Sequence, residues 1–185
     1  MLFRKNSNKI VEEMPQEKTV LKIKTVDDIP VIKEMRRKIG NNERREAVLY
    51  GYANLKSDYA RYFGSPLYGS NREFILGEMA NFGVKPENEE SLTDNIAIKA
   101  IIAESKYPEK ADNEDKEGKT NDREHTRFFA MKKIALFYFN YYEIARFGNY
   151  NWEKLEEKDI IDPVKDIYNY MDLMKLFYNG DSGGN

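Results

Sequence analysis

The feature that most constrains this chain is a stretch from Arg123 to Phe147 whose apolar side chains repeat at helical spacing. These residues recur every three or four positions, which is the period of one face of an α-helix. They are Phe128, Met131, Ala135, Tyr138, Tyr142 and Ala145. Further aromatic residues, among them Phe129 and Phe137, fall on other sides of the same helix. A helix that is apolar nearly all round is buried by its neighbours, so we expect 123–147 to be the central helix of the fold.

Capping residues and helix breakers predict the helices around it. Ser70-Asn-Arg-Glu73 is a capping box, in which each side chain bonds to the other residue's backbone amide, and it predicts a helix that stops at Gly83. Asp162-Pro163 places a cap directly before a proline, and this predicts a last helix that starts there and ends near Tyr178. Similar signals predict helices over 30–39, over 43–63 with Asn42 as cap, from Ser91 or Thr93 to about Lys106, and over 152–158.

These elements together predict an all-α fold. We expect a compact bundle of about five to seven helices around a central aromatic-rich helix, with flexible termini. Residues 1–26 are expected to form a flexible or extended arm. A short strand that includes Leu21 and Ile23 is the alternative. Residues 27–179 are expected to form a single helical domain with a mobile polar loop at 108–122, and residues 180–185 a flexible tail.

Composition excludes several classes of function. The 185 residues include no cysteine and one histidine, His125, which excludes disulfide scaffolds, thiolate zinc sites, cysteine catalysis and multi-histidine metal centres. No phosphate-binding glycine loop occurs, and no stretch reaches the roughly 20 apolar residues that cross a bilayer. We therefore predict no catalytic residue, cofactor or metal ligand, and a location in the cytoplasm or on the cytoplasmic side of a membrane.

Two groups of side chains are candidates for binding a partner. The first is a basic cluster that consists of Arg36, Arg37, Lys38, Arg44 and Arg45. Such a cluster attracts an anionic partner, a phosphate backbone or a membrane surface, or else it belongs to a helix face neutralised by the glutamates between its members. The second group consists of Tyr150 and Trp152, which fall outside the predicted apolar stripes or in links. If they are exposed together, they mark a contact patch.

Residues 42–147, a little over half of the chain, resemble a known family. The similar segments are Arg45-Glu-Ala-Val-Leu-Tyr-Gly-Tyr-Ala-Asn-Leu55, Ser70-Asn-Arg-Glu-Phe74, and Leu92-Thr93 through Ala103-Glu-Ser-Lys-Tyr107. The family is the small helical domain of unknown function that follows membrane helices, often at the C-terminal end of transglutaminase-like membrane proteins. The resemblance implies an excised soluble portion or a stand-alone relative, and it brings no catalytic residues. This chain departs from the family in its longer loop at 108–122 and in having no membrane segment.

Three hypotheses about function follow. The first is a non-enzymatic helical protein-interaction module, either cytosolic or the soluble part of a membrane-associated protein, whose partner is a protein. Its N-terminal segment is then the part expected to meet an anionic membrane surface, because residues 1–40 carry 10 basic and 6 acidic side chains. The second is a nucleic-acid-binding protein that uses the basic cluster, which the net charge of −2 disfavours. The third is an enzyme with a carboxylate–tyrosine site, which requires a deep pocket around a desolvated Asp or Glu.

Overall fold

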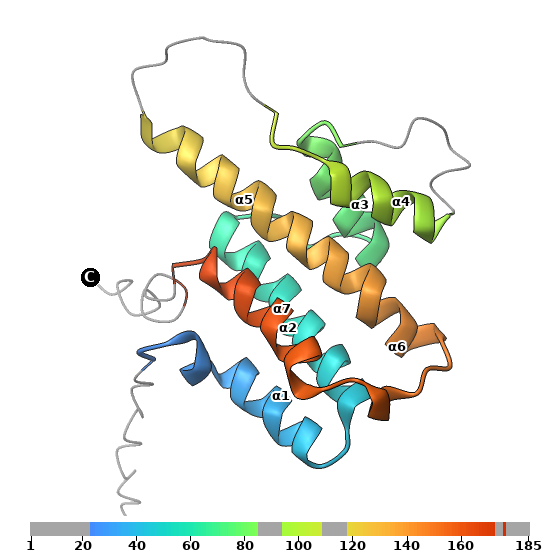
Figure 1. Cartoon of the computed structure of the whole chain (residues 1–185). Helices are drawn as coiled ribbons and strands as arrows, with labels where there is room; N and C mark the ends of the chain where they lie inside the picture. The colour runs from blue at the N-terminus through green and yellow to red at the C-terminus, as the bar shows by residue number, and fades with distance from the viewer. Residues whose placement is uncertain (1–22, 85–93, 109–117, 173–175, 177–185) are drawn as a thin grey trace, which may run out of the picture.

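The chain folds as an all-α bundle, as predicted (Figure 1). The computed structural model describes residues 23–84, 94–108, 118–172 and 176. Its α-helices are α1 (Pro30–Gly40), α2 (Arg44–Phe63), α3 (Asn71–Asn81), α4 (Asn95–Glu104), α5 (Gly118–Phe137), α6 (Glu143–Phe147) and α7 (Glu157–Asn169). A π-helical segment, η3 (Tyr138–Tyr142), connects α5 to α6, and short 3₁₀ turns lie at η1 (Val26–Asp28) and η4 (Trp152–Lys154).

The central element is the continuous helical stretch of α5, η3 and α6. Figure 1 shows it crossing the molecule, and α5 packs against α2, α3, α4 and α7. Its predicted stripe is buried from Phe128 to Tyr138 and again at Ala145, whereas Tyr142 is half-buried. The prediction of a central aromatic-rich helix is therefore confirmed, although the helix starts at Gly118 rather than Arg123 and widens into a π turn near its end.

Local capping signals account for several helix boundaries. Ser70 begins α3 as predicted: its hydroxyl accepts a hydrogen bond from the amide of Glu73 at 3.2 Å, and its own amide donates to the Glu73 carboxylate at 2.6 Å. Gly64 ends α2 in the left-handed region, with φ of 73°, where a residue without a Cβ is least strained. Asn42 does not cap α2, which starts at Arg44. Instead Asn42 takes a left-handed φ of 63° in the turn between α1 and α2.

The cap of α4 differs from the prediction. Asp94 takes this position, and its carboxylate accepts hydrogen bonds from the amides of Ile96 at 2.8 Å and Ala97 at 3.3 Å. The predicted caps at positions 91 and 93 lie outside the described residues. An aspartate directly before the first helical residue satisfies two free amides at once, which makes it a strong cap.

The last helix begins earlier than Asp162-Pro163, so that prediction is wrong. The helix starts at Glu157, after the amide of Glu156 donates to the Asp159 carboxylate at 2.9 Å, and Pro163 lies inside it. A proline inside a helix removes one backbone hydrogen bond at a cost of about 3 kcal/mol. Burial of the apolar face of α7 offsets that cost, through Ile160, Ile161, Val164, Ile167 and Tyr168.

The predicted ends and loop fall largely outside the described residues. Of the 1–26 arm, Ile23 is buried and η1 begins at Val26, so no strand forms over 23–26. Of the 108–122 loop, residues 118–122 belong to α5 because the helix continues back to Gly118. The predicted last helix to Tyr178 is interrupted, because α7 ends at Asn169; Leu176 is again helical, and residues 173–175 and 177–178 lie outside the described range. Residues 180–185 are outside the described range.

A buried ion pair connects α2, α3 and α5. Glu78 of α3 is 1% exposed, and its carboxylate accepts hydrogen bonds from Tyr59 at 3.0 Å, Ser65 at 3.2 Å and Arg127 at 2.9 Å. Arg127 also donates to the Ser65 hydroxyl at 3.1 Å. Burial lowers the pKa of Arg127, but the hydrogen bonds that its guanidinium donates to Tyr59 and Glu78 outweigh this effect and leave the pKa raised. A buried charge with this many partners is well compensated, whereas the loss of its counter-ion leaves a costly orphan.

We expect Arg127→Ala to lower the free energy of unfolding by about 3 kcal/mol, because it strands the Glu78 carboxylate in the core. Lys133→Ala is the matched control on the same helix, since its ion pair with Asp166 is exposed and contributes little. Urea denaturation followed by circular dichroism measures both. Adding Glu78→Gln to Arg127→Ala should recover at least about 1 kcal/mol by removing the stranded charge. No recovery would contradict this account.

We expect Tyr52→Phe to stabilise the fold. The Tyr52 hydroxyl is buried and has no hydrogen-bond partner among the described residues. The centroid of its ring lies 5.3 Å from that of Tyr138 and 4.2 Å from that of Tyr142. Removing an unsatisfied buried hydroxyl should raise the free energy of unfolding by about 1 kcal/mol, measured by urea denaturation. Tyr59→Phe is the control and should lower it, because that hydroxyl binds Glu78. Destabilisation by both variants would contradict the prediction.

Candidate protein-docking surface

The basic cluster is neutralised within the chain, and Arg36 shows how. Its guanidinium lies between two carboxylates: Nη2 is 2.7 Å from Asp27 Oδ1, and Nε donates to Glu157 Oε1 at 3.1 Å. These bonds connect α1 to η1 and α7. The hydrogen bonds from Lys165 and Arg36 hold the pKa of Asp27 below its usual value. Arg36 is therefore part of the fold's ion-pair network.

Arg37 and Lys38 pair with glutamates close to them in the sequence. Arg37 Nη2 is 2.7 Å from Glu34 Oε1, and Lys38 Nζ is 3.7 Å from both Glu34 Oε1 and Glu43 Oε2. Exposed pairs of this kind add little stability, but each places a negative charge beside the positive one. This part of the cluster matches the alternative of a salt-bridged helix face.

Arg44 and Arg45 bind backbone carbonyls on a distant segment. Arg44 Nε donates to the carbonyl of Leu155 at 3.1 Å, and Arg45 Nε donates to the carbonyl of Ala145 at 2.7 Å. Ala145 lies in α6, whose last-turn carbonyls have no helical partner of their own. The two arginines therefore fix the 145–155 segment against the start of α2.

The same segment carries Tyr150 and Trp152, whose rings are in contact. Their centroids are 5.2 Å apart and the rings meet edge to face. The Asn151 side chain between them accepts a hydrogen bond from the Glu153 amide at 3.1 Å and so caps η4. A small hollow of about 60 Å³ lies here, lined by Asn140, Tyr141, Ile144, Tyr150, Trp152 and Leu155. The structure thus brings Tyr150 and Trp152 together, and Arg44 and Arg45 support the segment that presents them.

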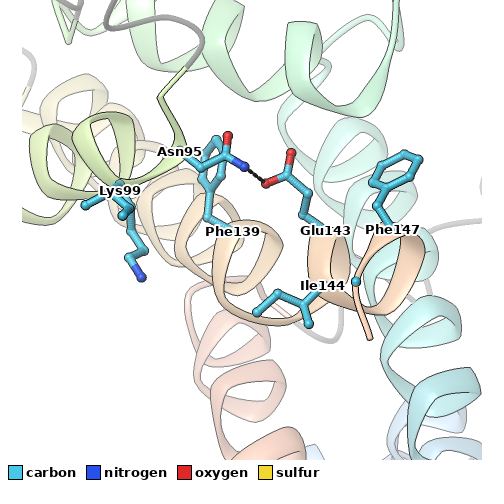
Figure 2. A pocket seen from close by; sticks show the side chains of 8 residues that line it. Asn95, Lys99, Phe139, Glu143, Ile144 and Phe147 are labelled. Atoms are coloured by element: carbon cyan, nitrogen blue, oxygen red, sulfur yellow. Dashed lines mark hydrogen bonds between the residues drawn. The ribbon is translucent and has the colours of Figure 1, made fainter. Parts of the chain in front are cut away.

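A larger hollow of about 370 Å³ lies between α4 and the stretch of η3 and α6 (Figure 2). Its lining residues are Asn95, Ile96, Lys99, Phe139, Glu143, Ile144, Phe147 and Gly148. Phe139, at 6% exposed, belongs to the core, whereas Ile96 and Phe147 are 76% and 78% exposed. Such exposure is unusual for two large apolar side chains that line one hollow, and clustered exposed apolar groups mark interaction sites. None of these residues was a binding candidate from the sequence.

A polar clasp supports the rim of this hollow. Arg72 of α3 donates to Glu143 Oε1 at 3.1 Å and to the side-chain oxygen of Asn95, and the Asn95 amide donates to Glu143 Oε2. Figure 2 shows the bond between Asn95 and Glu143 spanning the two sides of the hollow. The Arg72 guanidinium also lies 5.4 Å from the centre of the Phe139 ring. Three helical elements are therefore held in one geometry without any partner.

Ile144 lines both hollows, so they lie next to each other. We call the two together the α4–α6 surface and define its apolar part as Ile96, Phe139, Ile144, Phe147, Tyr150 and Trp152. The widened turn of η3 lies within it, and π-helical turns occur often at functional sites. Burial, with Glu143 nearby, raises the pKa of Tyr138 in this turn to about 12. The only sequence signal was that Ile96 falls off the buried Ile98–Ile102 spacing.

The carboxylate–tyrosine pairs required by the enzyme hypothesis exist, but they join helices. Tyr168 of α7 donates to Asp58 of α2 at 2.6 Å, in the same way that Tyr59 donates to Glu78. Burial raises the pKa of both tyrosines, so they remain protonated donors. The two hollows described above are lined by other side chains. Among the described residues, no group of three or more His, Asp or Glu side chains is placed to hold a metal ion.

We expect the change in the free energy of unfolding caused by Asp58→Asn to become more favourable as the pH rises. Burial raises the pKa of Asp58 above its ordinary value of 3.8, so the folded state binds this proton more tightly than the unfolded state. The contribution of this proton-binding group to stability is therefore full at a pH below the pKa of Asp58 in the unfolded state. It is lost as the pH rises through the pKa of Asp58 in the folded state. The free energy of unfolding of Asp58→Asn minus that of the wild type should be larger at about pH 7 than at about pH 3.5.

Asp27→Asn is the control of opposite sign for this pH dependence. The pKa of Asp27 is lowered by Lys165 and Arg36, so its contribution is present above the unfolded pKa and is lost in acid. The free energy of unfolding of Asp27→Asn minus that of the wild type should therefore be smaller at about pH 7 than at about pH 3.5. Urea titrations at both pH values test the pair, and slopes of the same sign would contradict the assignment.

The described helices include none that is long and apolar enough to cross a membrane. A scan against family models, a search of curated proteins and a search of solved structures each found no match to this chain. The resemblance of residues 42–147 to the helical domain of transglutaminase-like membrane proteins therefore stays a prediction.

Proposed function

We propose that this protein is a non-enzymatic protein-interaction module whose partner docks on the α4–α6 surface. The observation that carries the proposal is the 370 Å³ hollow with Ile96 and Phe147 exposed at its edge and Phe139 buried within it. Apolar area removed from water contributes roughly 25 cal/mol per Å², so a partner that covers these two side chains gains binding energy directly.

The rigidity of this surface favours binding further. The clasp of Arg72, Asn95 and Glu143 holds α3, α4 and α6 together in the free protein. A surface already held in one geometry loses less conformational entropy when a partner binds. Arg45 acts similarly from the other side, because its bond to the Ala145 carbonyl fixes α6 on α2.

The basic cluster supports a protein partner over a nucleic acid. Each of its five cations already has a carboxylate or carbonyl partner, so a phosphate backbone would have to displace bonds within the fold. Nucleic-acid binding draws its affinity from cations that release counter-ions on contact with phosphate. The resemblance of residues 42–147 extends the proposal: the partner would then be a protein of a membrane assembly, with the N-terminal segment at the membrane.

Site-specific photo-crosslinking tests this proposal. A benzoylphenylalanine placed at Phe147 in the full chain, expressed in the source cells, should give an adduct of discrete mass. The same group at Leu67, which is also apolar and 56% exposed but lies between α2 and α3, is the matched control and should give none.

Charge substitution provides the second part of the test. Ile96→Asp should reduce the adduct at position 147 at least about tenfold, since a partner that covers position 96 would have to bury an unpaired carboxylate. Ile96 is exposed, so its replacement should leave the unfolding curve of the free protein unchanged. Leu67→Asp should leave the adduct intact. Equal adducts at positions 147 and 67, or none at 147, would contradict the proposed docking surface.

A further inference from the structure

The charges around the larger hollow are not balanced. Its two charged lining residues are Glu143 and Lys99. Glu143 is already paired with Arg72 and bound by Asn95. Lys99 is half-buried, and within the described part of the chain it makes no ion pair or hydrogen bond. The hollow therefore combines apolar walls with one unneutralised cation.

The position of Lys99 explains why it remains unpaired. It lies four residues after Asn95 on α4, so the two side chains share a helix face one turn apart. Figure 2 shows its ammonium group pointing away from the bond between Asn95 and Glu143. Asp94, the capping carboxylate directly before α4, accepts hydrogen bonds from the amides of Ile96 and Ala97. No carboxylate of the described residues is therefore paired with Lys99.

We infer that the α4–α6 surface takes an acidic amphipathic protein segment, in which an apolar side chain enters the hollow and an adjacent carboxylate pairs with Lys99. This inference rests on the proposed docking function and names the chemistry of its partner. A charge-assisted hydrogen bond formed beside apolar walls is stronger than one in open water. A basic segment would meet Lys99 with a like charge and bind more weakly.

The shape of the site favours a protein segment over a membrane. Phe139 is buried beneath an open hollow whose sides come from α4 and α6, and Arg72 of α3 bonds to Glu143 at its side. A concave pocket matches a protruding side chain, whereas peripheral lipid binding uses apolar groups that project into the bilayer from a helix face. Ile96 and Phe147 at the edge can then cover the flanks of the bound segment.

Three matched synthetic peptides test the inference. Each is an amphipathic helix of about 14 residues, or four turns, with one Leu/Phe stripe and either Glu, Gln or Lys at the flanking positions. Fluorescence anisotropy with the full chain gives the three affinities. The Glu peptide should bind at least about tenfold more tightly than the Lys peptide, and the difference should shrink as salt is added.

Lys99→Gln should remove this ranking. It should bring the Glu and Gln peptides to within about twofold of each other, while Lys33→Gln on α1, an exposed lysine paired with Asp28, leaves the ranking unchanged. Equal affinities in the wild type, a ranking that survives Lys99→Gln, or no binding of any peptide would overturn the inference.

Three further outcomes bear on this inference and on the proposed function. An adduct at Phe147 in cells, together with no charge ranking among the peptides, would refute the acidic partner and leave the docking surface standing. Peptide binding that Ile96→Asp and Phe147→Asp do not weaken would refute the surface itself. Co-sedimentation with vesicles of phosphatidylcholine and phosphatidylserine, lost in Phe147→Asp, would assign the hollow to lipid and overturn the inference.

Discussion

The bundle depends on one carboxylate, that of Glu78. It receives hydrogen bonds from Tyr59 of α2, from Ser65 after α2 and from Arg127 of α5, so three helices meet at a single buried charge. Apolar packing alone lets helices slide past one another with small changes in energy, whereas a buried ion with fixed donors accepts one arrangement. Tyr168 and Asp58 form a second buried hydrogen bond of this kind, between α7 and α2. These contacts connect α2 to α3, α5 and α7.

The interior and the α4–α6 surface differ in whether their side chains have partners. Inside, the polar groups of Glu78 and Asp58 have partners, so they hold the fold rather than face a ligand. At the surface, Ile96 and Phe147 remain exposed to water and Lys99 has no counter-ion among the described residues. Features left unsatisfied in the free protein are those that a partner can satisfy. This contrast places the proposed function at the surface and away from the buried carboxylate–tyrosine pairs.

Sequence patterns predicted the elements better than their contacts. The three-to-four spacing identified the central helix, and the Ser70 capping box gave the start of α3, because both signals act within one helical turn. Pro163 led to a wrong predicted start for α7, because burial of the α7 face offsets the missing hydrogen bond and the helix continues through the proline. The basic cluster was recognised as ambiguous, and only the folded chain shows that Arg45 binds the carbonyl of Ala145, 100 positions away.

The sequence by itself determined the helical class, the aromatic central helix and the Ser70 cap of α3, because each depends on side chains within about four residues of one another. Tertiary structure alone decided which exposed groups meet. Ile96 and Phe147 lie on separate helices, and Arg72 reaches Glu143 across 71 positions to hold them around one hollow. Local periodicity carries no information about such distances, since helix packing sets them. The candidate docking surface is therefore a property of the fold.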